Sequence, residues 1–210
     1  MGKAYTNRKP VSERPESDFY PTPGFLTEEL LKSHEFIDII DRFKRYCHRD
    51  KRQPCILEPA CGDGAITKVL KKHLGFCDII SHDIRTDGVD FLSYTPERKT
   101  DMVITNPPFS LFDEFVKKAK EIAPVVIFIG KVNFFGAYNR HREGVWDNLR
   151  DVMIFNRQVD YRTENRDDGK FYCGNLVTGW FIWHRYWTAP YWITRIMDVQ
   201  DGVVKREVRK

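Results

Sequence analysis

The segment Asn106-Pro107-Pro108-Phe109 is the part of the sequence with the most specific chemistry. Two consecutive prolines fix the backbone and remove amide donors, which leaves carbonyl groups as acceptors beside the Asn106 side chain. An amino group on an aromatic ring is a poor nucleophile because its lone pair is delocalised into the ring. Hydrogen bonds accepted from both of its hydrogens, by Asn106 Oδ1 and the Pro107 carbonyl, favour the pyramidal nitrogen that attacks an electrophile. Phe109 would stack on that ring. The alternative interpretation is a strand-terminating turn.

A second candidate segment contains two glycines and runs from Glu58 through Pro59, Ala60, Cys61, Gly62 and Asp63 to Gly64. It follows an apolar run and precedes a helical pattern. Glycines allow a close approach to a ligand, and the exposed amides at a helix N-terminus favour a carboxylate or phosphate. The third glycine of a dinucleotide fingerprint and the Gly-Lys-Ser/Thr of a P-loop are both missing, so neither nucleotide motif is met. Alone, this segment is also compatible with a plain tight turn.

Two carboxylates further along extend this candidate site. Asp83 follows the next apolar run, where nucleoside-binding α/β folds place the carboxylate that accepts hydrogen bonds from ribose hydroxyls. Asp90 and Phe91 would offer a carboxylate to a purine amino group and an aromatic ring to its face. Taken alone, Asp83 could be a solvated strand-end cap, and the pair Asp90-Phe91 could be incidental.

The elements that must position these residues follow from hydrophobic periodicity. Apolar runs predict strands and helical spacings predict helices. The predicted strands are 55–57, 76–82, 102–105 and 125–130. The predicted helices are 65–74, 112–122 and 138–149, preceded by one or two helices between Phe25 and Tyr46, of which Thr27 would cap the first. The alternation predicts an α/β fold, a doubly wound and mostly parallel sheet with helices on both faces. Val152–Phe155 and Val177–His184 predict an antiparallel C-terminal strand pair. Ligands of such sheets bind at the carboxyl ends of strands, where the strand order reverses, and all the polar segments above fall at strand ends.

The composition predicts an ordinary globular protein. The chain has 210 residues, of which 41% are hydrophobic and 30% charged, and we expect a polar, flexible N-terminal arm at 1–17 and a single domain at 18–210. Five scattered cysteines without a Cys-x-x-Cys pair predict reduced thiols in the cytoplasm and no metal site. The N-terminus has no apolar core of a signal peptide, and no run of about 18 apolar residues predicts a membrane span.

The net charge of +4 comes from the last part of the chain, because lysine and arginine exceed acidic residues only within 131–210. Most of these cations are arginines, the side chain suited to bidentate contacts with phosphate and guanine. A solvated basic face is the alternative.

From about Phe19 to Asp198 the chain resembles the DNA N6-adenine methyltransferases of Rossmann-like fold, especially small phage and prophage members. The resemblance is carried, in the family's order, by Phe19-Tyr20-Pro21-Thr22-Pro23, Glu58–Gly64, Asp83, Asp90-Phe91 and Asn106–Phe109. It implies methyl transfer from S-adenosylmethionine to an adenine N6 in DNA, with the base flipped out of the duplex. It further implies that Asn106, Pro107, Pro108 and Phe109 form the catalytic segment. The implied cofactor-binding residues are Tyr20, Thr22, Pro23, Glu58, Pro59, Ala60, Cys61, Gly62, Gly64, Asp83, Asp90, Phe91 and Asn106.

Contacts with nucleic acid are expected from the later part of the chain. The candidates are Lys131, Asn139, Arg140, Arg157, Arg162 and Arg166. The polar loop Asn156–Asn175 is long for a hairpin connection and carries both signs of charge, which indicates target contact, although a loop without a role is the alternative. The tryptophans at alternate positions in Trp180–Trp187 predict sheet core more than base stacking.

Other functions remain open at this level. RNA adenine methyltransferases have the same catalytic segment, and a catalytically silent subunit that binds cofactor or nucleic acid is a further possibility, against which the intact Asn106–Phe109 argues. Methylation of glutamine in proteins ranks lower, because Phe109 stands where that form has tyrosine and because the arginine-rich end suits nucleic acid.

Overall fold

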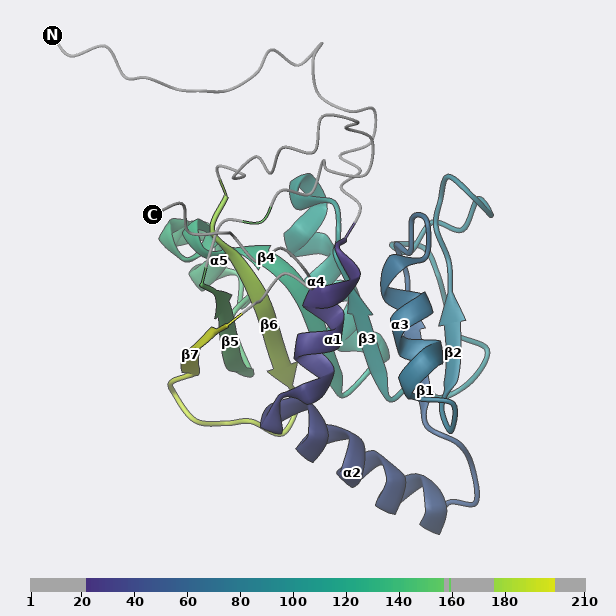
Figure 1. The fold of residues 1–210 in the computed structure, drawn as a ribbon. Helices are drawn as coiled ribbons and strands as arrows, with labels where there is room; N and C mark the ends of the chain where they lie inside the picture. The colour runs from purple at the N-terminus through teal and green to yellow at the C-terminus, as the bar shows by residue number, and fades with distance from the viewer. Residues whose placement is uncertain (1–21, 157–158, 160–175, 199–210) are drawn as a thin grey trace, which may run out of the picture.

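All strands of the computed structural model lie in one sheet of seven strands; the structure describes residues 22–156, 159 and 176–198 (Figure 1). The strand order is β2-β1-β3-β4-β6-β5-β7. The strands are β1 (Cys55–Glu58), β2 (Asp78–Ser81), β3 (Met102–Thr105), β4 (Val125–Lys131), β5 (Leu149–Phe155), β6 (Thr178–His184) and β7 (Ile193–Met197). The first four pair in parallel, and β6 runs antiparallel between β4 and β5. The predicted α/β class, with a mostly parallel sheet and an antiparallel C-terminal pair, is confirmed. Strand β7, parallel to β5, was not predicted.

Helices cover both faces of the sheet. They are α1 (Gly24–Lys32), α2 (His34–Arg49), α3 (Ala65–His73), α4 (Phe112–Ile122) and α5 (Tyr138–Arg142), with 3-10 turns η3 (Phe109–Leu111) and η4 (Val132–Gly136). In Figure 1, α1 and α3 lie in front of the sheet and α4 lies behind it. Two neighbouring residues of β6 show the same arrangement. Trp180 Nε1 donates to the Leu26 carbonyl of α1 at 3.0 Å on one face, while on the other face the Phe181 ring packs against Phe112 of α4, with ring centroids 6.3 Å apart. Burial on two faces explains why the strands read as continuous apolar runs.

The core is strongly aromatic around β6. Trp180 and Trp183 are almost fully buried, with 0% and 1% of their surface exposed. Each indole N–H has a backbone acceptor, which for Trp183 is the Val145 carbonyl at 2.9 Å. The prediction that the tryptophans of Trp180–Trp187 belong to the core is confirmed for Trp180 and Trp183, whereas Trp187 lies beyond β6 and is half-buried.

Two local predictions about helices were wrong. Helix α1 begins at Gly24 after Pro23, whose carbonyl accepts from Leu26 N at 3.0 Å, so Thr27 lies inside the helix and does not cap it. The helix predicted at 138–149 ends at Arg142, because Gly144 and Asn148 adopt left-handed backbone with φ of 70° and 62° and turn the chain into β5.

The predicted arm 1–17, most of the loop Asn156–Asn175 and the C-terminal residues 199–210 lie outside the described residues. The extent of the single domain therefore stays a prediction. In the part of the chain that the structure describes, every helix is too short or too polar to cross a membrane.

Candidate active site

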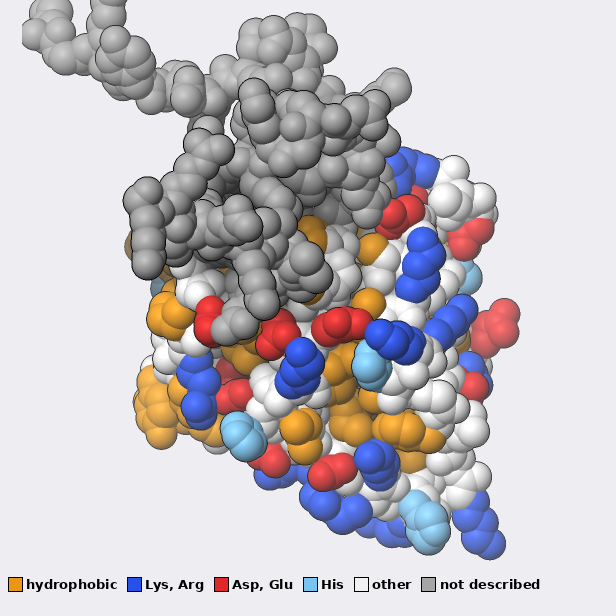
Figure 2. Space-filling view, in the orientation of Figure 1, with side chains coloured by type: hydrophobic (Ala, Val, Ile, Leu, Met, Phe, Trp, Pro, Cys, Tyr) orange, Lys and Arg blue, Asp and Glu red, His pale blue; other side chains and the backbone are white. Residues whose placement is uncertain are grey.

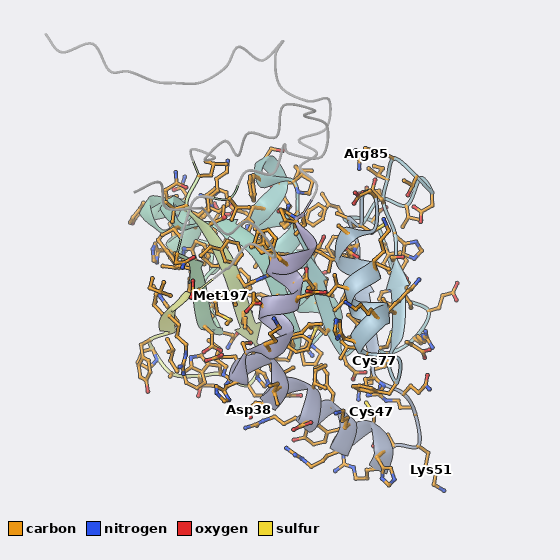
Figure 3. The ribbon with its side chains drawn as sticks, viewed as in Figure 1. Asp38, Cys47, Lys51, Cys77, Arg85 and Met197 are labelled. Atoms are coloured by element: carbon orange, nitrogen blue, oxygen red, sulfur yellow. The ribbon has the colours of Figure 1, made fainter. Side chains whose placement is uncertain are left out.

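The candidate residues gather at one edge of the sheet, where the parallel strands end. Glu58 ends β1, Asp83 follows β2, Asn106 follows β3 and Lys131 ends β4. The strand order reverses between β1 and β3, because the chain adds β2 on one side of β1 and then β3 on the other. In Figure 3, Arg85 lies at this edge and Lys51, beyond the end of α2, at the opposite end of the molecule. The sequence prediction of a site at the switch point therefore has the expected geometry.

The loop after β1 is hydrogen-bonded to the residues that follow β2. Gly62 and Gly64 have φ of 56° and 79°, the left-handed region that favours glycine. The Gly62 amide donates to Asp83 Oδ2 at 2.8 Å, and the Cys61 amide donates to the His82 carbonyl at 2.9 Å. Gly64 precedes α3 without a side-chain cap. This loop places the start of α3 beside the ends of β1 and β2.

Glu58 is a buried carboxyl group at the base of this loop. Only 1% of its surface is exposed, and the Thr67 hydroxyl of α3 donates to its Oε2. The pKa of Glu58 is raised from 4.5 to about 8. Burial is the main cause, the hydrogen bonds with Thr67 lower the pKa in part, and the negative charges of Asp63 and Asp83 contribute to the rise. Acidic side chains therefore gather at this loop and disfavour a polyphosphate, while Glu58 itself keeps its proton near neutral pH.

The thiol of Cys61 is in surroundings that favour its protonated form. Burial, with the charges of Glu58 and Asp83, raises the pKa of Cys61 to about 11, so the thiol keeps its proton at neutral pH.

The Asp83 carboxylate joins several segments. Oδ1 accepts from the Arg85 amide at 2.9 Å and from Arg85 Nε at 3.1 Å, while Oδ2 accepts from Gly62. Asp83 is 5% exposed. Each carboxylate oxygen can accept more than one hydrogen bond, so these contacts are compatible with the expected ribose contact.

Of the neighbouring pair Asp90-Phe91, the aspartate is at the surface and the phenylalanine is in the core. Asp90 is exposed, and its Oδ1 accepts from the Leu92 amide at 3.0 Å. Phe91 is 2% exposed and packs against Phe115 of α4 at 5.0 Å between ring centroids. The ring expected to face a purine therefore lies in the core in this structure, where α4 covers it.

The segment Asn106–Phe109 meets both the start of the described chain and the β1 loop. Asn106 Nδ2 donates to the buried Thr22 hydroxyl at 3.1 Å, and Thr105 Oγ1 donates to the Ala60 carbonyl at 3.3 Å. These bonds bring together three segments that the resemblance assigns to one site. In this structure the Asn106 amide is oriented with Nδ2 toward Thr22.

The two prolines and Phe109 are packed closely. Pro107 is buried, and the Pro108 carbonyl accepts from Leu111 N at 3.0 Å in η3. Phe109 is 7% exposed and contacts Phe134 nearly perpendicularly, with centroids 6.0 Å apart.

Two cations lie against these rings. Lys131 Nζ is 4.4 Å from the centroid of Phe109, and the Arg140 guanidinium is 4.2 Å from that of Phe134. Arg140 Nε also donates to Asp113 Oδ1 at 2.6 Å. Lys131 thus lies against Phe109, and Arg140 lies against the neighbouring ring of Phe134.

The remaining candidates divide into two groups. Asn139 is exposed at the start of α5, while Pro23 and Pro59 support the backbone before α1 and after β1. The other candidates fall outside the described residues: Tyr20, Arg157, Arg162 and Arg166.

Sequence reasoning missed four residues that contact the site: Thr67, Arg85, Asp113 and Phe134. Phe134 had a signal, because it belongs to the aromatic pair directly after the 125–130 run. The other three contact candidates through side-chain bonds that sequence spacing does not reveal.

A cavity of about 390 Å³ lies away from this edge, between α1, α2 and α3. Its apolar floor includes Leu31, Phe36, Ile40 and Phe76, and Figure 2 shows hydrophobic side chains there among Lys, His and acidic groups. None of the described candidate residues lines it. Within the described ranges, no three His, Cys, Asp or Glu side chains are grouped so as to hold a metal ion.

No protein-family model matches the chain, and no curated protein matches it. Among solved structures, it is similar to PH1948 from Pyrococcus horikoshii, provisionally described as an RNA methyltransferase, at 16% identity and a TM-score of 0.48 over 82% of this chain and 88% of that one. A Lactococcus lactis protein provisionally described as a hemolysin gives 12% identity and 0.49 over 82% and 91%. The 23S rRNA methyltransferase ErmE gives 14% and 0.42 over 65% and 63%. At these low scores the similarities carry no argument about function.

Proposed function

We propose that this chain is an S-adenosylmethionine-dependent methyltransferase that methylates the N6 amino group of adenine in DNA. One observation carries the proposal: the amine-accepting Asn106 and the carboxylate-rich β1 loop flank the switch point, joined by the bond from Thr105 Oγ1 to the Ala60 carbonyl at 3.3 Å. In open α/β sheets this is where ligands bind. A ligand at the β1 loop would therefore lie next to an amine held by Asn106.

The charge of the site fits the cofactor. S-adenosylmethionine is a sulfonium and an ammonium ion, and it supplies an electrophilic methyl group. Glu58 and Asp83 offer carboxyl groups at the β1 loop, and both are almost fully buried. A positively charged ligand would stabilise ionised Glu58, whose pKa is raised to about 8 in the structure without ligand. Asp83 would accept from the ribose hydroxyls, and the left-handed Gly62 and Gly64 would let the backbone approach.

The chemistry assigned to Asn106 follows from its orientation. With Nδ2 donating to Thr22, Oδ1 is the amide atom that would accept an amine hydrogen. Together with the Pro107 carbonyl, this acceptor favours a nitrogen lone pair directed at the electrophile. Transfer is then direct and depends on positioning, with no side-chain nucleophile.

A nucleic acid is the proposed substrate because Lys131 lies over Phe109 and Arg140 over Phe134, and the choice of DNA over RNA rests on the family resemblance of the sequence. A base in a duplex cannot reach this edge, so the target adenine would be flipped out or taken from a single strand.

Transfer of label from tritiated S-adenosylmethionine to DNA, RNA and protein tests the proposal with the purified chain and with Asn106→Ala. We expect label in DNA adenine with the wild type and none with the variant, while calorimetry gives cofactor affinities within a few fold of each other. Label found only in RNA would identify RNA, and not DNA, as the substrate. Undiminished transfer by Asn106→Ala would remove Asn106 from its role, and no transfer to any polymer would refute the proposal.

A further inference from the structure

His82 directly follows β2 and is held in place on both sides of its backbone. Its amide donates to the Glu58 carbonyl at 2.9 Å, and its carbonyl accepts from the Cys61 amide at 2.9 Å. Its ring packs against Tyr94, with ring centroids 5.2 Å apart. These contacts continue the pairing of β1 with β2 past the last residue of β2. His82 is therefore a fixed point at the start of the loop in which Arg85 is labelled in Figure 3.

Asp87 lies in this loop, and its carboxylate joins the two ends of the loop. Oδ2 is hydrogen-bonded to His82 Nδ1 at 2.8 Å, while Oδ1 accepts from the Asp83 amide at 3.2 Å and from the Val89 amide at 3.1 Å. The bond with His82 holds the pKa of Asp87 below its usual value, so the carboxylate is ionised at neutral pH and can only accept. One oxygen atom therefore sets the spacing between the amide of Asp83 and the amide that precedes Asp90.

The backbone of the loop supports the two ends differently. At the start, the Asp83 carbonyl accepts from the Thr86 and Asp87 amides, both at 3.0 Å, and forms a turn. At the other end, the Val89 amide donates to the Asp87 carboxylate and not to a backbone carbonyl. The place of Asp90 relative to Asp83 therefore depends on the side chain of Asp87.

Resting on the proposed function, we propose that Asp87 is a positioning residue for the nucleoside half of S-adenosylmethionine: together with His82 it holds Asp83 and Asp90 at the separation at which both contact the same adenosine. Asp87 acts through these two carboxylates and not on the reacting atoms. Loss of its side chain lowers the fraction of molecules whose loop is ready to bind, and the apparent affinity falls by that fraction.

The expected effect is confined to binding of the nucleoside. Asp87→Ala is expected to bind S-adenosylmethionine about tenfold more weakly, which corresponds to a binding-competent loop in about one molecule in ten. 5′-Methylthioadenosine, which has the adenine and the ribose but no amino acid, is expected to lose the same factor. The KM for S-adenosylmethionine rises accordingly, while kcat stays within about twofold, because Asn106–Phe109 follow β3, on the other side of β1.

Calorimetry with both ligands compares the full chain as wild type, Asp87→Ala, Asp87→Asn and the control Asp78→Ala. Asp78 begins β2, has a side chain that is 38% exposed like that of Asp87, and is likewise paired with one base, Arg98, at 2.7 Å. Asp78→Ala is expected to bind both ligands as the wild type does. Asp87→Asn is expected to restore affinity to within about threefold of the wild type, because its Oδ1 can accept from both amides and its Nδ2 can donate to His82 Nδ1 in the other neutral tautomer.

A milder variant covers the case in which Asp87→Ala does not fold. His82→Phe keeps a ring against Tyr94 but removes the bond to Asp87. It is expected to weaken the binding of S-adenosylmethionine and of 5′-methylthioadenosine by equal factors, and urea unfolding shows which variants are folded in the assay.

The outcomes separate this role from the proposed function. If folded Asp87→Ala binds S-adenosylmethionine as tightly as Asp78→Ala, or if it loses much more affinity for S-adenosylmethionine than for 5′-methylthioadenosine, the positioning role is overturned and the proposed function stands. If the wild type binds no S-adenosylmethionine, both are overturned. If the wild type binds S-adenosylmethionine but labels no polymer, the proposed function alone is overturned, because calorimetry still measures the role of Asp87.

Discussion

Glu58→Gln should make the protein more stable at alkaline pH, although it changes a single buried group. Glu58 is 1% exposed, and its pKa is raised from 4.5 to about 8. The folded protein therefore keeps a proton that the unfolded chain loses, and unfolding releases it. The stability that depends on this proton is fully present below about pH 4.5 and is lost as the pH rises through about 8. Glutamine is neutral at every pH and can still accept from Thr67.

The magnitude follows from the pKa difference. Each pH unit inside the window lowers the free energy of unfolding by about 1.4 kcal/mol for one proton. Between pH 6.0 and 7.5 the contribution of Glu58 is therefore about 2 kcal/mol. Asp151, whose burial raises its pKa to about 6, also titrates at the lower end of this interval, but it does so equally in both proteins, so the difference between wild type and Glu58→Gln isolates Glu58.

Urea unfolding followed by tryptophan fluorescence, at pH 6.0 and 7.5, measures the effect in both proteins. The wild type is expected to lose about 2 kcal/mol more than Glu58→Gln between the two pH values. Equal losses in the two proteins would refute a protonated Glu58 in the folded state.

Three other changes test separate parts of the structure. Asp83→Ala is expected to weaken S-adenosylmethionine binding more than tenfold in calorimetry, because charge-assisted bonds to the ribose are worth roughly 1.5–3 kcal/mol, and unchanged affinity would place the ribose elsewhere. Gly179→Ala should lower the free energy of unfolding by about 3 kcal/mol, since a Cβ there would be 2.4 Å from the Met153 carbonyl oxygen, whereas Gly136→Ala, with open space around the new atom, should change it little; similar urea midpoints would contradict this packing. Replacing Gln158–Phe171, which the structure does not describe apart from Val159, with a short Gly-Ser linker should keep cofactor binding but reduce methylation of duplex DNA, and an unaltered rate would place recognition elsewhere.

The helices and strands with a clear apolar pattern could be predicted from the sequence. Strand β3 and helix α4 have the predicted bounds, because a four-residue apolar run and an amphipathic period leave little choice. Strand β7 was missed, since four of its five residues are exposed and it has no apolar run. Helix α5 is shorter than predicted because the left-handed residues after it, Gly144 and Asn148, interrupt a pattern that would otherwise continue.

The candidate site likewise has a part that could be predicted from the sequence and a part that could not. The order of motifs and the rule for strand ends place Glu58, Asp83 and Asn106 at one edge without any knowledge of tertiary packing. The burial of Phe91 depends on how α4 covers it. The contact between Lys131 and Phe109 joins the end of β4 to the start of η3. Such long-range side-chain contacts leave no periodic signal in a single sequence.

Nucleoside mass spectrometry of DNA and RNA from cells that express the wild type or Asn106→Ala tests the central claim most directly. The account predicts that N6-methyl-2′-deoxyadenosine rises in DNA with the wild type and stays at the background level with Asn106→Ala. Unchanged levels of methylated adenine in both polymers, or an equal rise with Asn106→Ala, would contradict it.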